Sequence, residues 1–315
     1  MRPTLRRIII AIAAFTVLNF AGDALLKYGL HRFYGLDRHP HILLTGHSQL
    51  AQGSDKKGLE DSLGRNIAKF CLSGAGVEER DVLLHYVLDS EAGDSVNTVV
   101  YAVDPWLFNN RRLTKNMHRM FLPLTGAPAA DSLLATKLSA GRRLLYKTVP
   151  LARYNDEQIS YALRGMAGNW NNIHHNRVDT AVARRYVGSG NYRYIAPDSV
   201  RIVTFRNTLK MLRQRGIRIL LVGMPGLYVY NEAQPEAYAR VDSLYRAIAD
   251  ADTGIYYFNL DPEFSHRAEM FSDAVHLNAA GQKAVTSRLA QIIKERTEEV
   301  CFEGDRETKT HKYQK

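Results

Sequence analysis

A serine near the amino-terminal end and an aspartate–histidine pair near the carboxyl-terminal end are residue types that can do chemistry together. Ser48 follows residues 41–46, an apolar run that reads as a strand ending in glycine. Asp273 lies three residues before His276. A serine hydroxyl attacks a carbonyl when a neighbouring base takes its proton, and a carboxylate can hold a histidine in the tautomer for that task. We therefore predict Ser48 as nucleophile, His276 as base and Asp273 as the residue that orients the base.

The same three residues have a second interpretation that involves no catalysis. Ser48 would then cap the amino terminus of a helix, while Asp273 and His276 would form a local hydrogen bond within a turn. The distance between the Ser48 hydroxyl and the His276 ring distinguishes the two interpretations.

Five strand-like segments alternate with helix-like segments along the chain. The strands are expected at residues 41–45, 66–72, 97–103, 217–225 and 255–260, and the helices at 77–90, 198–216, 235–250 and 279–295. This alternation is typical of a parallel sheet with helical crossovers. We predict a three-layer α/β/α domain with a five-stranded, mainly parallel sheet of the flavodoxin-like type. Ser48 and His276 would then meet at the carboxyl edge of the sheet, where ligands bind.

Two further candidate residues follow the third predicted strand. This strand stops at Asp104-Pro105-Trp106, because proline cannot continue a strand ladder. Asp104 and Trp106 are therefore expected beside the same crevice. Asp104 has three open roles there: it can bind substrate, hydrogen-bond the Ser48 loop, or cap the next turn.

The amino-terminal segment has the composition of a membrane anchor. Residues 1–7 carry three arginines and precede a run without charge at residues 8–22. A spanning helix needs about 20 mostly apolar residues, a length reached here only when Asp23 lies at the far interface. We predict an uncleaved single-pass anchor over residues 1–30, with the main domain on the periplasmic side of the inner (cytoplasmic) membrane. A cleaved signal peptide and a buried amino-terminal helix are the alternatives.

The main domain is predicted over residues 31–300, with an insertion at about 109–197 and a disordered tail at 301–315. Long insertions at a functional edge are often lids. The amide-rich segment 169–176 suits contact with a sugar, and equally suits a plain exposed loop. Its adjacent histidines have no acidic partner at a ligand spacing, so we expect no metal site.

The chain is basic, with 42 Lys and Arg against 32 Asp and Glu and a formal net charge of +10. A solvated basic surface accounts for this charge, and so does affinity for anionic envelope polymers or lipid head groups. The cations are spread along the chain without a recognisable binding motif, which argues against nucleic acid as a partner. Cys71 and Cys301 have no metal-ligand spacing, and a disulfide between them cannot be inferred from sequence.

These motifs together resemble those of the SGNH/GDSL hydrolase superfamily. Gly46-His47-Ser48-Gln49 stands where that family has its Gly-Asp-Ser block, and Asp273-Ala274-Val275-His276 matches its Asp-x-x-His block. His47 departs from the family pattern. Val103-Asp104-Pro105-Trp106 is the nearest counterpart of the Gly-x-Asn-Asp block and lacks its asparagine. The resemblance implies an oxyanion hole made of backbone N–H groups near Gln49 and at Gly74 or Gly76. The two glycines are equally consistent with a simple turn from strand to helix.

Within the superfamily, the chain looks most similar to membrane-anchored envelope proteins of acyl transfer, such as the alginate O-acetylation and teichoic-acid D-alanine transfer proteins. That likeness implies a Ser-His-Asp esterase or O-acyltransferase that uses no cofactor and acts on an acylated sugar or envelope glycan. It also allows a membrane-bound acyltransferase as a partner. The alternative is a non-catalytic envelope scaffold or polysaccharide-binding module on a degenerate SGNH fold.

Overall fold

A five-stranded parallel sheet forms the centre of the protein. The computed structural model describes residues 3–109, 116–170, 172–189 and 194–310. The strands are β1 (Ile42–Gly46), β2 (Ile67–Cys71), β3 (Thr98–Val103), β4 (Arg218–Gly223) and β5 (Ile255–Asn259). They lie in the order β2-β1-β3-β4-β5, and every neighbouring pair is parallel. The predicted α/β fold with a five-stranded sheet is confirmed.

The strand order reverses direction at β1. The chain passes from β1 to β2 on one side and then returns to β3 on the other side. In open α/β sheets, ligands bind at such a switch point, outside the carboxyl ends of the strands. All residues of β1, β2 and β3 are buried, as expected for strands covered on both faces. Ser48 follows β1 directly and therefore lies at this switch point.

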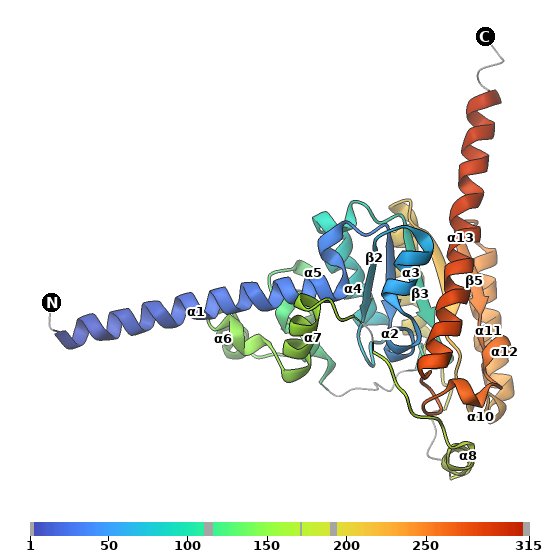
Figure 1. The fold of residues 1–315 in the computed structure, drawn as a ribbon, viewed down its shortest axis with the longest axis horizontal. Helices are drawn as coiled ribbons and strands as arrows, with labels where there is room; N and C mark the ends of the chain where they lie inside the picture. The colour runs from blue at the N-terminus through green and yellow to red at the C-terminus, as the bar shows by residue number, and fades with distance from the viewer. Residues whose placement is uncertain (1–2, 110–115, 171, 190–193, 311–315) are drawn as a thin grey trace.

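Helices cover both faces of the sheet, as Figure 1 shows. On one face lie α3 (Lys56–Leu63) and α13 (Ala279–Thr310), which contact each other. Right-handed crossovers place α4 (Val77–Leu88), α9 (Ser199–Gln214) and α11 (Pro235–Asp250) on the other face, where α4 contacts α9. The sheet therefore lies between two helical layers, as the alternation of strands and helices predicts.

The last helix is longer than its apolar spacing predicts. That spacing predicts an end near Glu295, whereas α13 continues to Thr310 and extends away from the domain (Figure 1). The segment expected as a tail from Cys301 therefore begins within this helix. Residues 311–315 lie outside the described residues.

The inserted segment, residues 109–197, contains short helices. Asn109 and Pro197 pair in an antiparallel bridge that brings the two ends of the segment together. Its described elements are η3 (Met117–Leu124), α5 (Pro128–Ala135), α6 (Ala140–Thr148), η4 (Pro150–Arg153), α7 (Asp156–Met166) and α8 (Thr180–Gly188). Elsewhere the short elements are α2 (Ser48–Gly53), α10 (Val229–Glu232), α12 (Asp261–Phe264), η1 (Leu36–Arg38), η2 (Glu91–Gly93) and η5 (Ala268–Met270). Asn171, in the amide-rich segment, lies outside the described residues.

The amino-terminal helix α1 (Pro3–Tyr34) is long and apolar enough to cross a membrane, judged by its length and composition alone. Its first part projects from the domain in Figure 1. Its last part packs against α7, where a Cβ on Gly29 would lie 2.4 Å from the Ala162 carbonyl oxygen. A Cβ on Gly165 would lie 2.0 Å from the Gly29 carbonyl oxygen. The two helices approach so closely because both contact positions are glycine.

Candidate active site

Ser48 lies at the turn from β1 into α2. Gly46 ends the strand where a Cβ would lie 2.7 Å from the Ala102 side chain, so a larger residue would not fit. His47 is extended and caps α2, accepting a hydrogen bond at Nδ1 from the Gln49 N–H at 3.1 Å. Ser48 is the first residue of the helix and is half-buried. Its hydroxyl is therefore held at the crevice by a strand end and a capped helix.

The structure brings together the three side chains of the predicted triad. His276 Nε2 lies 2.8 Å from Ser48 Oγ, and His276 Nδ1 lies 2.8 Å from Asp273 Oδ2. Asp273 Oδ1 also accepts hydrogen bonds from the N–H groups of Val275 at 2.7 Å and His276 at 2.8 Å. The turn from Asp273 to His276 therefore fixes the carboxylate against the ring, and the ring against the serine.

The protonation of Asp273 determines which nitrogen of His276 is available to Ser48. Burial raises the pKa of Asp273, but the hydrogen bonds from His276 and Val275 outweigh burial and lower this pKa to about 2. An ionised carboxylate can only accept hydrogen bonds. In the neutral ring, Nδ1 therefore carries the proton, and the Nε2 lone pair faces the Ser48 hydroxyl. This is the arrangement that a general base needs.

A second histidine–aspartate pair lies buried beside the serine turn. His47 Nε2 lies 2.7 Å from Asp104 Oδ2. Because His47 Nδ1 accepts the Gln49 N–H, Nε2 carries the proton and donates it to Asp104. Burial lowers the pKa of His47 against the attraction of Asp104, which favours the neutral ring. His47 is thus a fixed structural group with both ring nitrogens occupied.

Asp104 supports the serine loop from within the protein. Arg80 is buried and lies 3.8 Å from the Asp104 carboxylate. Burial raises the pKa of Asp104, but His47 and Arg80 lower it below its usual value overall. Asp104 Oδ1 accepts the Trp106 N–H at 2.8 Å. Asp104 therefore hydrogen-bonds the Ser48 loop through His47 and caps the next turn. The expected role in substrate binding is not supported, because the carboxylate is buried and its oxygens already accept these hydrogen bonds.

Trp106 is also enclosed by protein. Its side chain is buried, and its ring meets the ring of Tyr230 edge-on with 5.6 Å between centroids. We had expected Trp106 beside the crevice as a substrate contact, whereas its packing gives it a structural role next to the β3 end.

Gln49 connects two parts of the site instead of offering a free donor. Its backbone N–H is taken by His47, which corrects the expectation that this group binds an oxyanion. Its side-chain Nε2 donates to the Val275 carbonyl at 3.3 Å and to the Pro225 carbonyl at 3.5 Å. Gln49 therefore ties the serine helix to the turn that carries Asp273 and His276.

Two turns at the carboxyl ends of β1 and β2 contain further candidate backbone donors. Gly74 lies in the turn after β2, where its φ of +80° favours glycine. This turn is joined to the end of β1 by the Leu72 N–H, which donates to the Gly46 carbonyl at 3.2 Å. The Ser48 N–H lies in the first turn of α2 and has no intrahelical acceptor. Gly74 and Ser48 are therefore the backbone donors that remain candidates for an oxyanion.

The insertion contributes a residue to the site that sequence reasoning missed. The His174 ring lies with its centroid 6.5 Å from that of His276. The His174 carbonyl accepts the Ala279 N–H at 2.8 Å, and Asn176 Nδ2 donates to the Ser272 carbonyl at 2.8 Å. His174 belongs to the segment 169–176, which we expected to contact a sugar or to form a plain exposed loop, but nothing in the local sequence indicates its contact with His276. Among the described residues, no group of three or more His, Cys, Asp and Glu side chains could hold a metal ion.

A buried carboxylate holds the loop that follows β4. Asp261 Oδ1 accepts the Gly226 N–H at 2.9 Å, and Oδ2 accepts hydrogen bonds from Tyr238 at 2.7 Å and Asn231 at 2.8 Å. Burial raises the pKa of Asp261 to about 6, against the hydrogen bonds that favour its charged form. The neighbouring Leu227 N–H donates to the Ala274 carbonyl at 3.0 Å. Asp261 therefore positions a loop that touches the Asp273–His276 turn.

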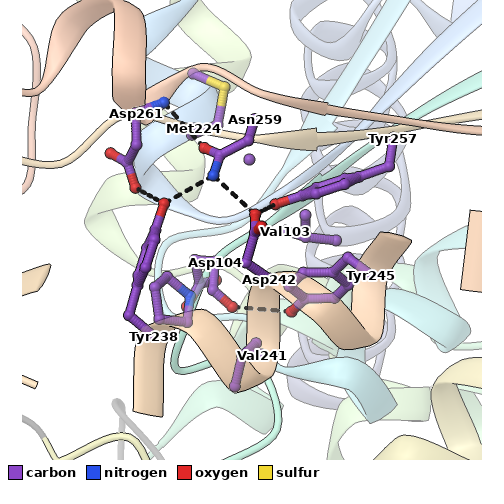
Figure 2. A pocket seen from close by; sticks show the side chains of 12 residues that line it. Val103, Asp104, Met224, Tyr238, Val241, Asp242, Tyr245, Tyr257, Asn259 and Asp261 are labelled. Carbon is purple, nitrogen blue, oxygen red and sulfur yellow. Dashed lines mark hydrogen bonds between the residues drawn. The ribbon is translucent and has the colours of Figure 1, made fainter. Parts of the chain in front are cut away.

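Figure 2 shows the polar network around this carboxylate. It surrounds a cavity of about 10 Å³. Asn259 Nδ2 donates to Asp242 at 2.8 Å, and Tyr257 donates to the same oxygen at 2.7 Å. Tyr245 donates to the Asp104 carbonyl at 2.9 Å. These bonds connect the ends of β3 and β5 through α11 and stiffen the edge on which the candidate site lies.

Comparison with known proteins finds only distant likeness. No family model and no curated protein matches the sequence. Similar solved structures include a GDSL-like lipase from Bacteroides thetaiotaomicron, a lipase from a goat rumen metagenome and an acetyl xylan esterase from the rumen bacterium Butyrivibrio proteoclasticus. Their identities are 10%, 11% and 10%, and their TM-scores are 0.38, 0.38 and 0.34. The matches cover 82%, 79% and 81% of this chain and 90%, 94% and 64% of those chains.

The chain resembles the SGNH/GDSL superfamily in the placement of two motifs. Its serine follows the first strand, and its Asp-x-x-His turn precedes the last helix, as in the pattern of that superfamily. The distant likenesses themselves say nothing about the reaction, which has to be argued from the geometry of Ser48, Asp273 and His276.

Proposed function

We propose that this protein is a serine esterase or O-acyltransferase with Ser48 as nucleophile, His276 as general base and Asp273 as the orienting carboxylate. The observation that carries the proposal is the 2.8 Å contact between His276 Nε2 and Ser48 Oγ, with Asp273 on the opposite ring nitrogen. The non-catalytic interpretation requires only the bond between Asp273 and His276. It gives no reason for the ring to meet a serine 228 positions away.

The reaction proceeds in two halves. Ser48 Oγ attacks the ester carbonyl as its proton passes to His276 Nε2, and the alkoxide formed from the carbonyl oxygen is held by the N–H groups of Ser48 and Gly74. His276 then returns the proton to the leaving alcohol, which leaves an acyl-serine. Water or a sugar hydroxyl then attacks the acyl-serine as its proton passes to His276. His276 gives this proton to Ser48 Oγ as the bond from Oγ to the acyl group breaks, which restores the free serine. Hydrolysis and transfer differ only in this acceptor.

The oxyanion site has few donors. The segment Val103-Asp104-Pro105-Trp106, the nearest counterpart of the family's Gly-x-Asn-Asp block, has no asparagine, and the Gln49 N–H is occupied by His47. A single donor of this kind typically lowers the barrier by about 3 kcal/mol. The proposed enzyme is therefore slow, with a turnover about 100-fold below that of a site with one more donor.

The proposed substrate is an acylated glycan of the cell envelope, reached from the outer side of the cytoplasmic membrane. Support comes from α1, which can anchor the domain at a membrane, and from His174, which lies beside the base and can hydrogen-bond a sugar hydroxyl. A non-catalytic polysaccharide-binding module remains the second candidate, because the segment 103–106 lacks the asparagine of the family's Gly-x-Asn-Asp block.

The experiment uses the full chain in detergent with p-nitrophenyl acetate and with an acetylated glycan. We expect acetate release that is lost in Ser48→Ala and retained in Ser62→Ala, an exposed serine on α3. Acetyl groups appearing on an added deacetylated glycan indicate transfer, whereas free acetate alone indicates hydrolysis. A folded wild type that binds the glycan but releases no acetate would support the binding module instead.

A further inference from the structure

The insertion presents large apolar side chains to solvent on α6 and η4. Leu144 is 62% exposed, Leu145 is 48% exposed and Leu151 is 37% exposed. η4 contacts both α1 and α6, and α6 lies at the edge of the domain that faces the amino terminus in Figure 1. Exposed apolar side chains that gather on one face mark a surface that contacts something other than water.

The same stretch of chain is strongly basic. Arg142, Arg143 and Lys147 are exposed on α6. From Ser132 to Asn155 the sequence has five Lys and Arg residues and no Asp or Glu. Leucines combined with Lys and Arg on one short helix are characteristic of helices that lie at the surface of an anionic membrane. A cavity of about 260 Å³ lies beside α6, and its lining includes Leu134, Leu138 and Leu144 together with Asp131, Arg143 and Lys147.

The length of α1 independently brings this surface to a membrane. Side chains 3–18 of α1 are all exposed, and the helix first meets the domain where Asn19 Oδ1 accepts the Leu151 N–H at 3.3 Å. The uncharged run starts after Arg7, and its exposed residues 8–18 span about 16 Å at 1.5 Å per residue, whereas the hydrocarbon core of a bilayer is about 30 Å thick. A bilayer crossed by α1 must therefore extend as far as Leu151.

The charge pattern of α1 gives the same boundary. The uncharged run ends at Gly22, whose Cβ position already lies 2.9 Å from the Leu151 side chain. The next residue, Asp23, pairs with Arg153 at 3.4 Å. The last apolar turn of α1 therefore lies beside η4. The ion pair between Asp23 and Arg153 follows it and lies on the side of the lipid head groups.

We infer that α6 and η4 form a membrane-docking surface, with Leu144, Leu145 and Leu151 in the boundary between head groups and acyl chains of an anionic bilayer. Arg142, Arg143 and Lys147 contact the lipid phosphates. The inference rests on α1 crossing that bilayer and is independent of the reaction at Ser48. The domain is then held in one orientation by two contacts, because a single helix would leave it free to swivel.

The test places an environment-sensitive NBD dye at Leu145→Cys in the full chain, in a Cys71→Ala, Cys301→Ser background. The matched control carries the dye at Val203→Cys on α9, which is 56% exposed in the structure. In vesicles of phosphatidylglycerol and phosphatidylcholine, we expect blue-shifted emission at 145 that nitroxide lipids quench and aqueous iodide does not. The dye at 203 should show the emission of a dye in water and should be quenched by iodide. Equal quenching of both sites by iodide would overturn the inference.

A charge-reversed variant tests the lipid contact separately from the anchor. We expect Arg142→Glu, Arg143→Glu and Lys147→Glu together to return the emission at 145 to that in water, while α1 still resists extraction by alkaline carbonate. Unchanged emission in this variant, or carbonate release of the unmodified chain, would contradict the inference. Ser48→Ala should keep the signal at 145, and the charge-reversed variant should keep hydrolysis of p-nitrophenyl acetate, so failure of either proposal can be recognised on its own.

Discussion

The two histidine–aspartate pairs near Ser48 differ in exposure and therefore in what they can do. The side chains of His276 and Asp273 are 24% and 56% exposed, and the ring can exchange protons with solvent or substrate. His47 and Asp104 are buried, and both nitrogens of His47 are engaged. Proton transfer therefore belongs to the exposed pair, and the buried pair holds the turn in place.

Asp273→Asn tests the orienting role of this carboxylate. An amide in this position can donate to Nδ1, which would put the proton on Nε2 and remove the lone pair that faces Ser48. We expect kcat/KM for p-nitrophenyl acetate to fall at least about 100-fold. Asp61→Asn, an exposed aspartate on α3, is the matched control and should leave kcat/KM unchanged. Full activity in a folded Asp273→Asn variant would show that the carboxylate does not orient the base.

Some residues of the site could be predicted from the sequence around them, and others could not. Ser48, Asp273 and His276 could be singled out because each lies in a short pattern at a strand or helix boundary. The meeting of His174 with His276 could not be predicted, because it depends on the path of the insertion over the last turn. Nor does the sequence around Arg80 show that its guanidinium lies beside Asp104.

At the scale of elements, the crossing of α1 and α7 depends on two glycines. Gly165→Ala would place a Cβ 2.0 Å from the Gly29 carbonyl oxygen, so the helices must move apart. We expect a loss of about 1–3 kcal/mol in the free energy of unfolding, measured by circular dichroism of the full chain in detergent. A larger residue at Gly29 should act in the same direction, because its Cβ would meet the Ala162 carbonyl.

Gly188→Ala is the matched control for this prediction. Gly188 ends α8, and no atom lies within 4 Å of a Cβ built there. Alanine should therefore be neutral or raise the free energy of unfolding by up to about 1 kcal/mol, because it restricts the unfolded chain. Equal effects of the two substitutions would mean that the helix crossing is not as close as described.

The limits of the strands can be predicted from the sequence more accurately than the positions of the helices in the insertion. The limits of β3, β4 and β5 lie within two residues of those predicted, because buried parallel strands are continuous apolar runs with clear ends. The short helices of the insertion have exposed faces and interrupted apolar spacing, so their packing against α1 fixes them more than their own pattern does. The position of α7 could not be predicted for that reason.

At the scale of the whole molecule, Asp261 links stability to pH. Its pKa in the folded protein is about 6, because burial disfavours the charge. Below about pH 4 the group is protonated in both the folded and the unfolded chain. Between about pH 4 and 6 the unfolded chain loses the proton first, so stability falls as pH rises. The full effect is about 3 kcal/mol.

Asp261→Asn removes this titration. We expect the wild-type melting temperature to fall between pH 4 and 6.5 relative to that of Asp261→Asn, and the two curves to run parallel above pH 7. Thermal unfolding of both proteins in the same detergent across this range provides the measurement. A constant difference between the curves from pH 4 to pH 7 would show that Asp261 has an ordinary pKa.

The most direct test of the central claim is covalent labelling of the full chain by a fluorophosphonate, with the adduct located by peptide mass spectrometry. Such reagents report a serine hydroxyl that a neighbouring base activates. We predict an adduct on Ser48 in the wild type, none in Ser48→Ala, and a much slower reaction in His276→Ala. A folded wild type without an adduct on Ser48, or equal labelling rates in the wild type and His276→Ala, would contradict the account.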